Sequence, residues 1–176
     1  MNVFVLNTGR CGSTTFIKAC QHINNYTSSH ESLLDKTGQQ RLNYPDNHIE
    51  ADNRLSWFLG QLDKKYSDDA VYVHLKRERQ AVAESFSKRI DFGILKAYEQ
   101  GILLHAEHRL CAFDIAVDYI DTVNANIELF LKDKTHKIDV SVETVSTDFP
   151  RFWEMIGAQG DLDEAIKEWS INYNAS

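Results

Sequence analysis

The sequence predicts an α/β fold in which a short, mainly parallel β-sheet is flanked by helices in three layers. Short apolar runs, typical of strands covered on both faces, alternate with longer segments whose apolar residues recur at helical spacing. No repeat, low-complexity tract or Pro/Gly-rich linker interrupts the 176 residues. We therefore expect residues 1–176 to form a single domain.

The first third of the chain begins with a strand, a tight loop and a helix. Residues 3–6 are a continuous apolar run, and a turn of small residues follows them. Helical spacing then appears at Phe16, Ala19, Cys20 and Ile23. A second short strand is expected at residues 26–28. A helix is expected from Asn53, with an apolar face made of Leu55, Phe58, Leu59 and Leu62.

The middle of the chain predicts another buried strand and three helices. The apolar run at residues 70–75 is the strand, and Val82, Phe86 and Ile90 mark a helix after it. Residues 92–104 are expected to be a separate helical segment. Between residues 110 and 131 the apolar positions step by three and four, which predicts a long amphipathic helix packed on the core.

The last third of the chain predicts a strand and two further helices. Residues 137–142 form the weaker strand. Residues 149–156 are expected to be a helix with Pro150 in its first turn and Gly157 at its end. The final helix is marked by Leu162, Ala165, Ile166 and Trp169.

Composition restricts the classes of partner. The formal net charge is −7, which argues against nucleic acids and membrane surfaces, because both attract a basic protein. Three cysteines without a Cys-x-x-Cys pair indicate neither a disulfide framework nor a zinc site. No apolar run approaches the roughly 20 residues of a membrane span, and residues 3–6 are too short for a signal peptide. We therefore expect a cytoplasmic protein.

The loop between the first strand and the first helix has the composition of an anion-binding turn. Backbone N–H groups at a helix N-terminus lack partners within the helix, and the helix dipole adds positive charge there. Gly9 and Gly12 let a ligand approach the backbone, and Arg10 adds a fixed charge. Hydroxyl groups are supplied by Ser13, Thr14 and Thr15. These features predict a bound phosphate or sulfate, and the alternative is a glycine-containing turn without a ligand.

Two better-known kinds of phosphate chemistry fit this loop poorly. The loop of nucleoside triphosphatases has four residues between its glycines and then Gly-Lys-Ser/Thr. Only two residues separate Gly9 from Gly12, and no lysine follows. A thiol in such a loop is also a candidate nucleophile. However, a cysteine phosphatase has an arginine six positions after its cysteine, and Cys11 has Ile17 there.

The loop resembles the 5′-phosphosulfate loop of P-loop sulfotransferases, which use 3′-phosphoadenosine 5′-phosphosulfate (PAPS) as donor. That loop runs as a basic residue, a small residue, Gly and two Ser/Thr. Arg10 takes the basic position and Cys11 the small one. Direct matches follow at Gly12, Ser13 and Thr14, with Thr15 beside them. The resemblance implies a P-loop-type fold in which these six residues bind the donor.

The same family has a second donor signature, an arginine at the end of a later strand and a serine eight residues on. Both bind the 3′-phosphate of the donor. Arg77 and Ser85 have this separation and follow the predicted strand at residues 70–75. An arginine fork pairs well with a phosphate. Arg79 stands where the family usually has proline. Taken alone, without the first loop, residues 76–79 favour a solvated charged turn.

The resemblance implies transfer of a sulfuryl group from PAPS to a hydroxyl or amine of a small-molecule or glycan acceptor, without a metal. Arg10 would stabilise the developing charge. In several branches of the family a glutamate just past the second strand resembles the general base, and Glu31 has that place. His30 is the reserve candidate, because its unperturbed pKa lies near neutrality. An exposed polar loop is the alternative for both.

Two other functions remain open at this point. A P-loop phosphotransferase, such as a small-molecule kinase, needs a lysine and a magnesium-binding carboxylate, and neither is evident. A sulfotransferase-like protein that binds a nucleotide or a partner without catalysis is the other. His105 and His108, three residues apart, are interpreted as surface histidines rather than as a metal pair.

Overall fold

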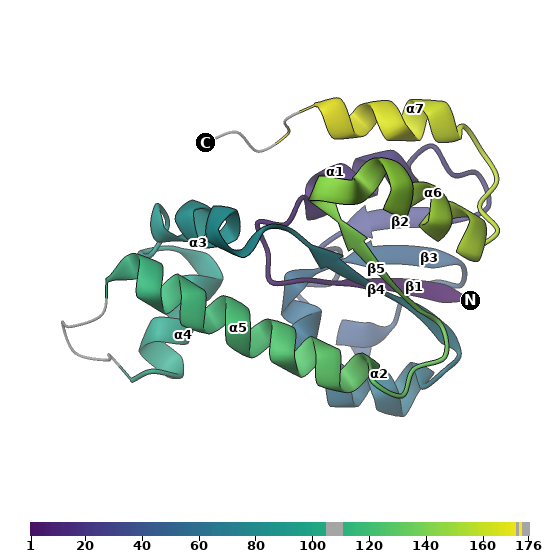
Figure 1. Ribbon diagram of the computed structural model, residues 1–176. Coiled ribbons are helices and arrows are strands. Elements are labelled where there is room, and N and C mark those ends of the chain that lie inside the picture. The colour runs from purple at the N-terminus through teal and green to yellow at the C-terminus, as the bar shows by residue number, and fades with distance from the viewer. Residues whose placement is uncertain (105–110, 172, 174–176) are drawn as a thin grey trace.

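A five-stranded β-sheet with the strand order β2-β3-β1-β4-β5 lies between layers of helices in the computed structural model (Figure 1). The structure describes residues 1–104, 111–171 and 173. Each pair of neighbouring strands in this sheet is parallel. The predicted three-layer α/β fold is confirmed, and the sheet is parallel throughout rather than only mainly so.

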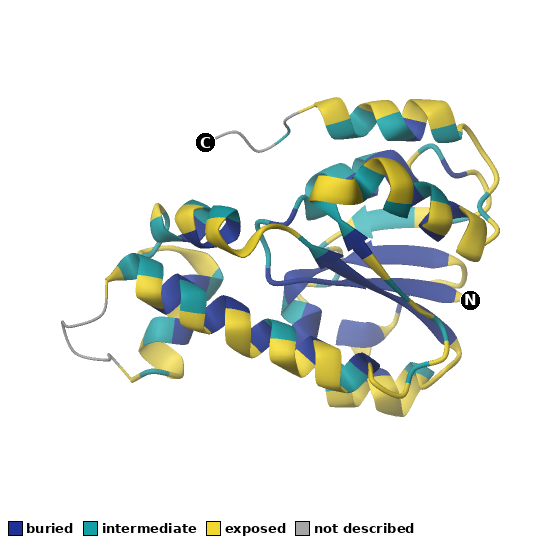
Figure 2. Cartoon of the chain, viewed as in Figure 1, coloured by how far each residue is buried: buried dark blue, intermediate teal, exposed yellow. Residues whose placement is uncertain are grey.

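The three inner strands of the sheet are buried along almost their whole length (Figure 2). The strands are β1 (Asn2–Leu6), β2 (Thr27–His30), β3 (His48–Ala51), β4 (Ala70–Lys76) and β5 (Lys137–Ser141). The register pairs Leu6 with His74, and His30 with Ala51. The carboxyl ends of neighbouring strands therefore lie at one edge of the sheet, and the loops that leave them meet there.

Helices cover both faces of the sheet (Figure 1). They are α1 (Ser13–Cys20), α2 (Leu59–Tyr66), α3 (Arg79–Ser87), α4 (Gly93–Gly101), α5 (Ala112–Leu131), α6 (Val145–Met155) and α7 (Leu162–Lys167). α1, α6 and α7 lie on one side, and α2 and α5 lie on the other, with α3 and α4 packed on α5. None of the helices in the described part of the chain has the length and apolarity needed to cross a bilayer.

Aromatic side chains hold α1 in place on its side of the sheet. The Phe16 ring of α1 lies 5.0 Å from Phe152 and 5.4 Å from Phe149, both on α6, measured between ring centroids. It also meets Trp169, in the 3₁₀ helix η4 (Glu168–Ser170), edge to face at 6.1 Å. Ring contacts of this kind are worth about 0.5–1.5 kcal/mol each beyond the area they bury. They fix the position of α1 and of the loop that precedes it.

The helix expected from Asn53 is divided in two. The chain forms a 3₁₀ helix, η2 (Asn53–Trp57), and then α2. Phe58 between them has φ −117° and ψ 19°, outside the helical region, so the expected continuous helix was wrong. Asp52 explains the early turn, because its side chain accepts a hydrogen bond from the Arg54 N–H at 2.8 Å and caps η2.

The proline of α6 was also misplaced. The helix begins at Val145, so Pro150 lies inside it rather than in its first turn. The extra turn is anchored upstream, where Asp148 accepts hydrogen bonds from the Ser141 N–H and the Thr144 hydroxyl. Gly157 does end the helix, with φ +60°, and the Ala158 N–H reaches back to the Trp153 carbonyl at 3.0 Å.

The remaining elements differ from expectation in detail. β3 was not predicted, and α3 ends at Ser87, before Ile90. The long helix α5 begins at Ala112. Short 3₁₀ helices η1 (Gly38–Leu42) and η3 (Val142–Thr144) complete the description.

We predict that Gly160→Ala strongly destabilises the fold. Gly160 has φ +150°, and a Cβ built there would lie 2.0 Å from the carbonyl oxygen of His22, where the chain passes the end of α1. Backbone strain and overpacking each cost about 1–3 kcal/mol. We expect the free energy of unfolding, measured in urea, to fall by about 3 kcal/mol.

Gly60→Ala is the matched control for Gly160→Ala. Gly60 lies in α2, and no neighbouring atom is within 4 Å of the position that its Cβ would take, so its replacement should raise stability by up to about 1 kcal/mol. A similar, small effect for both substitutions would contradict the tight passage of the chain at Gly160.

Candidate functional site

A cleft of about 360 Å³ lies at the carboxyl edge of the sheet. Its wall is built by the loops that follow β1, β2, β3 and β4, and by the segment from the end of α3 to the start of α4. This volume is in the range of small-molecule sites. Loops that are distant in sequence meet here only because the strands are parallel.

The β1–α1 loop forms one wall of the cleft. Gly9, Arg10 and Gly12 all have positive φ angles, at 88°, 59° and 82°. A Cβ on Gly9 would lie 3.0 Å from Asn53 Nδ2 and 3.2 Å from Phe86 Cζ, so only glycine fits without a shift. The first hydrogen bond of α1 runs from the Phe16 N–H to the Gly12 carbonyl at 2.9 Å. N–H groups in the first turn of a helix have no acceptor within it, which makes this end of α1 suited to anion binding.

Helix caps distinguish α1 from α3. The N-cap residue of α1 is Gly12, which has no side chain to cap the helix. α3, by contrast, is capped by its own Glu78, whose carboxylate accepts hydrogen bonds from Gln80 at 2.9 Å and Ala81 at 2.6 Å. The positive end of α1 is therefore available to an external anion, whereas that of α3 already has one.

Buried hydrogen bonds fix the backbone where the loop begins. The Asn7 side chain donates to the Val5 carbonyl at 3.1 Å and accepts from the Gly9 N–H at 2.8 Å. From α5, the Tyr119 hydroxyl donates to the Thr8 carbonyl at 2.8 Å, and burial raises the pKa of this phenol. The loop is thus held by β1 and by a helix on the opposite side of the sheet.

Cys11 lies beneath the loop rather than in the cleft wall. Its side chain is 3% exposed. Its Sγ donates to the Gly9 carbonyl at 3.2 Å and contacts Thr8 Oγ1 at 3.1 Å. Burial raises the pKa of this thiol, which opposes formation of the thiolate that a nucleophile needs. The other loop residues named from the sequence, Arg10, Gly12, Ser13, Thr14 and Thr15, line the cleft.

The arginine and serine of the second motif meet the loop at Arg10. Arg10 Nε donates to Ser85 Oγ at 2.8 Å, and Arg77 Nη1 donates to the Arg10 carbonyl at 3.2 Å. Arg77 itself lines the cleft. Two segments that are distant in sequence are thereby joined at one residue, Ser85 through the Arg10 side chain and Arg77 through the Arg10 carbonyl.

The cleft concentrates positive charge. Burial of Arg10, together with the nearby charges of Arg89 and Arg77, lowers the pKa of the Arg10 guanidinium. Arg89 follows α3 and, like Arg54, lines the cleft. Guanidinium groups this close repel one another, and a bound anion relieves the repulsion. A protein with a net charge of −7 thus has a local site of the opposite sign.

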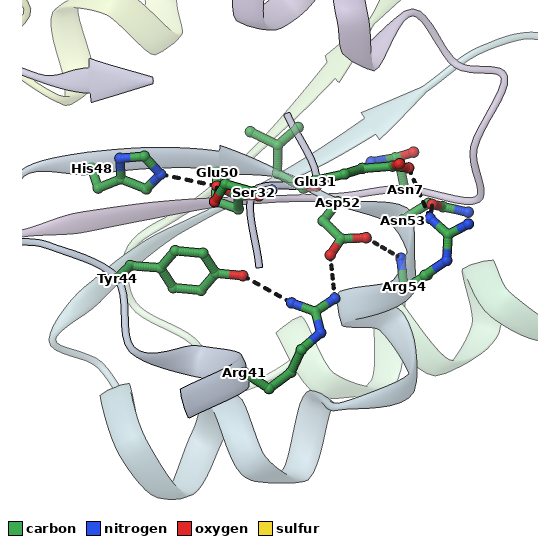
Figure 3. Close-up of polar contacts among 11 residues, drawn as sticks. Asn7, Glu31, Ser32, Arg41, Tyr44, His48, Glu50, Asp52, Asn53 and Arg54 are labelled. Carbon is green, nitrogen blue, oxygen red and sulfur yellow. Dashed lines mark hydrogen bonds and ion pairs between the residues drawn. The ribbon is translucent and has the colours of Figure 1, made fainter. Parts of the chain in front are cut away.

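Glu31 and His30 lie in the same wall. Glu31 directly follows β2, and its N–H extends the ladder to the Ala51 carbonyl at 3.0 Å. Its carboxylate forms an ion pair with Arg54 at 3.0 Å (Figure 3). His30 Nε2 lies 2.9 Å from the hydroxyl of Ser13, the first residue of α1. Both candidate bases therefore line the cleft, His30 beside Ser13 and Glu31 beside Arg54.

Sequence reasoning missed Asn53, Arg54, Arg89 and Phe92, which also line the cleft. Asn53 and Arg54 follow β3, and that strand has no apolar run to reveal it. Arg89 lies shortly after Ser85, in the turn beyond the end of α3. Its closeness in sequence to Ser85 was the only available signal for these four residues.

Within residues 1–104, 111–171 and 173, no group of three or more His, Cys, Asp or Glu side chains is arranged to hold a metal ion. His105 and His108 lie outside the residues that the structure describes.

The solved structures that resemble this chain include two sulfotransferases. The sulfotransferase domain from the curacin biosynthetic pathway matches with a TM-score of 0.64 and 11% sequence identity, over 99% of this chain and 78% of that one. Mouse sulfotransferase SULT7A1, complexed with PAP, matches with a TM-score of 0.52 and 13% identity, over 96% of this chain and 63% of that one. No family model and no curated protein sequence matches the chain. The chain has a sulfotransferase-like fold.

Proposed function

We propose that this protein transfers a sulfuryl group from PAPS to a hydroxyl or amine of an acceptor. The observation that carries the proposal is the meeting of the two donor motifs at one cleft, where Arg10 contacts both Ser85 and Arg77. The sulfotransferase-like fold supports it, and so does the PAP bound in the SULT7A1 structure.

The donor would bind along the β1 and β4 side of the cleft. Its 5′-phosphosulfate would accept hydrogen bonds from the N–H groups at the start of α1 and from Arg10. Its 3′-phosphate would bind Arg77 and Ser85. Arg89 adds a further positive charge beside Arg10, which the anionic nucleotide would offset. The two ends of one ligand thus match the two groups of donors.

The reaction would be an in-line displacement at sulfur. A lone pair of the acceptor oxygen or nitrogen forms the new bond to sulfur, while the bond from sulfur to the bridging oxygen breaks. The electron pair of the broken bond stays on the phosphate of the departing 3′-phosphoadenosine 5′-phosphate (PAP). Arg10 and the α1 amides would stabilise this developing charge.

Glu31 would receive the proton of the acceptor. Its carboxylate lies in the cleft wall, and Arg54 holds it there. His30, hydrogen-bonded to Ser13, is the second candidate. By analogy with phosphoryl transfer, the protein contributes mainly positioning and electrostatic stabilisation.

PAP should raise the melting temperature more than ATP with magnesium does. PAP has the 3′-phosphate that Arg77 and Ser85 would bind, and the loop lacks the lysine that ATP needs. At a concentration 100-fold above its Kd, a ligand stabilises the folded state by about 2.7 kcal/mol. A thermal-shift comparison at equal concentrations measures this, and the reverse order would favour the phosphotransferase.

Arg77→Ala should weaken PAP binding by about 10- to 100-fold, because charge-assisted hydrogen bonds contribute about 1.5–3 kcal/mol. Binding of adenosine 5′-phosphosulfate, which lacks the 3′-phosphate, should change little. Isothermal titration calorimetry measures both affinities. Arg79→Ala is the control, since Arg79 is exposed and pairs with Asp121 at 2.6 Å. Equal losses for both nucleotides would remove Arg77 from the 3′-phosphate site.

Glu31→Gln should lower kcat by about 100-fold or more, as expected for loss of a general base, with the Kd for PAP unchanged. Turnover is followed as PAP release in the presence of a panel of hydroxyl and amine acceptors. Glu154→Gln, on the exposed side of α6, is the control. Unaltered kcat in Glu31→Gln would exclude Glu31 and leave His30 as the base, and wild-type protein without turnover would favour a binding function.

A further inference from the structure

Glu50 is a completely buried carboxylate in β3, with 0% of its surface exposed. Burial of a charged group is costly unless its oxygens receive hydrogen bonds. Glu50 Oε1 accepts from the Ser32 N–H at 2.7 Å, and Oε2 accepts from the Ser32 hydroxyl at 2.7 Å (Figure 3). Two of its hydrogen bonds therefore come from one residue, and that residue directly follows Glu31.

His48 also contacts the Glu50 carboxylate, at the oxygen that accepts from the Ser32 hydroxyl. Its Nε2 lies 2.9 Å from Glu50 Oε2, and its Nδ1 lies 2.7 Å from the Thr27 hydroxyl. A neutral ring with its proton on Nε2 donates to Glu50 and accepts from Thr27. The ring also stacks on Tyr44, with centroids 5.6 Å apart and planes 10° apart. The Glu50 side chain is thus held in place by His48 and Thr27 in addition to Ser32.

The backbone of Glu31, just before Ser32, is in an unfavourable conformation. Glu31 has φ +54°, a left-handed value that a non-glycine residue adopts only where its surroundings hold it. The Ala51 carbonyl holds its N–H, and Glu50 holds the next residue. The strained residue is therefore clamped on both sides by β3.

The partner of Glu31 is fixed by Asp52, which directly follows β3. Asp52 is also buried, and its Oδ1 accepts from the Arg54 N–H at 2.8 Å (Figure 3). Its other oxygen pairs with the buried Arg41. Asp52 continues the extended backbone of β3, in which side chains alternate, so its carboxylate lies on the same side as that of Glu50. One carboxylate fixes the segment of Glu31, and the next fixes the segment of Arg54.

We propose that Glu50 is a positioning residue: by binding the backbone and hydroxyl of Ser32, it holds Glu31 in the left-handed conformation that directs its carboxylate to Arg54 in the cleft. The catalytic consequence rests on the proposed function, in which Glu31 is the base. The geometric consequence concerns Glu31 and Arg54 alone and can be measured without turnover.

The geometric test is the guanidinium ¹⁵N NMR signal of Arg54 in the full chain. Glu50→Gln replaces two acceptor oxygens with one amide oxygen and an NH₂ group, which cannot accept the hydrogen bonds from Ser32 or His48. The Glu31–Arg54 pair should therefore loosen, and the Arg54 signal should shift. Tyr66→Phe is the control, because it removes another hydrogen bond, from Tyr66 to the Leu42 carbonyl at 2.6 Å. An Arg54 signal that stays in place in Glu50→Gln overturns the proposal. Ser32→Ala, which should shift it similarly, replaces Glu50→Gln if that variant does not fold.

The catalytic test is a double-mutant cycle between Glu50 and Glu31. Glu50→Gln should lower kcat roughly fivefold, the ratio that corresponds to about 1 kcal/mol between charged and neutral hydrogen bonds, with the Kd for PAP unchanged. In a Glu31→Gln background it should cause no further loss. An equal loss in both backgrounds shows a general structural effect and overturns the positioning role.

The two tests separate the two proposals. If wild-type protein transfers no sulfuryl group, or Glu31→Gln leaves kcat intact, the proposed function or its base fails. The Arg54 signal then still decides whether Glu50 positions Glu31. If Glu31→Gln abolishes turnover but Glu50→Gln leaves the Arg54 signal in place, the proposed function stands and the role of Glu50 fails.

Discussion

The parallel register of the sheet is the constraint on which the site depends. Leu6, His30, Ala51 and Lys76 end four neighbouring strands at one edge, so the loops after them open into the same space. In this way the β1–α1 loop, Glu31, Arg54 and Arg77 share a cleft although they are distant in sequence. A shift of one strand by one residue would turn its side chains to the other face of the sheet, and its loop would no longer line the cleft.

Local electrostatics act against the overall charge of the chain. The net charge is −7, but the cleft gathers several arginines around a helix end that has no cap of its own. Two carboxylates in or beside the cleft already have partners: Glu78 caps α3, and Glu31 is paired with Arg54. An acidic protein surface combined with a basic cleft favours a small anionic ligand over a polyanion that would also meet the surface.

Much of the fold and half of the candidate site follow from short-range patterns. The apolar runs of β1 and β4 predicted buried strands, and the small residues of the first loop predicted an anion-binding turn. These patterns depend on neighbouring residues in the sequence and not on tertiary contacts. β3 was not predicted, since His48 and Glu50 are buried charged or polar groups in a four-residue strand and resemble a surface segment. Their burial depends on Ser32 and Thr27, partners that only the folded chain brings together. Arg54 was missed for the same reason, and Pro150 was misplaced because the anchor at Asp148 is a tertiary contact.

The edge-to-face contact between Phe16 and Trp169 joins the two ends of the described chain. Trp169 also lies beside Gly12, 3.6 Å from where a Cβ would be. During synthesis α1 leaves the ribosome long before the segments that cover it, so its aromatic face must stay exposed until α6 and η4 have emerged. Contacts between residues so far apart in sequence slow folding and prolong exposure of apolar surface. The anion-binding loop is thus synthesised well before the aromatic residues that hold it in place.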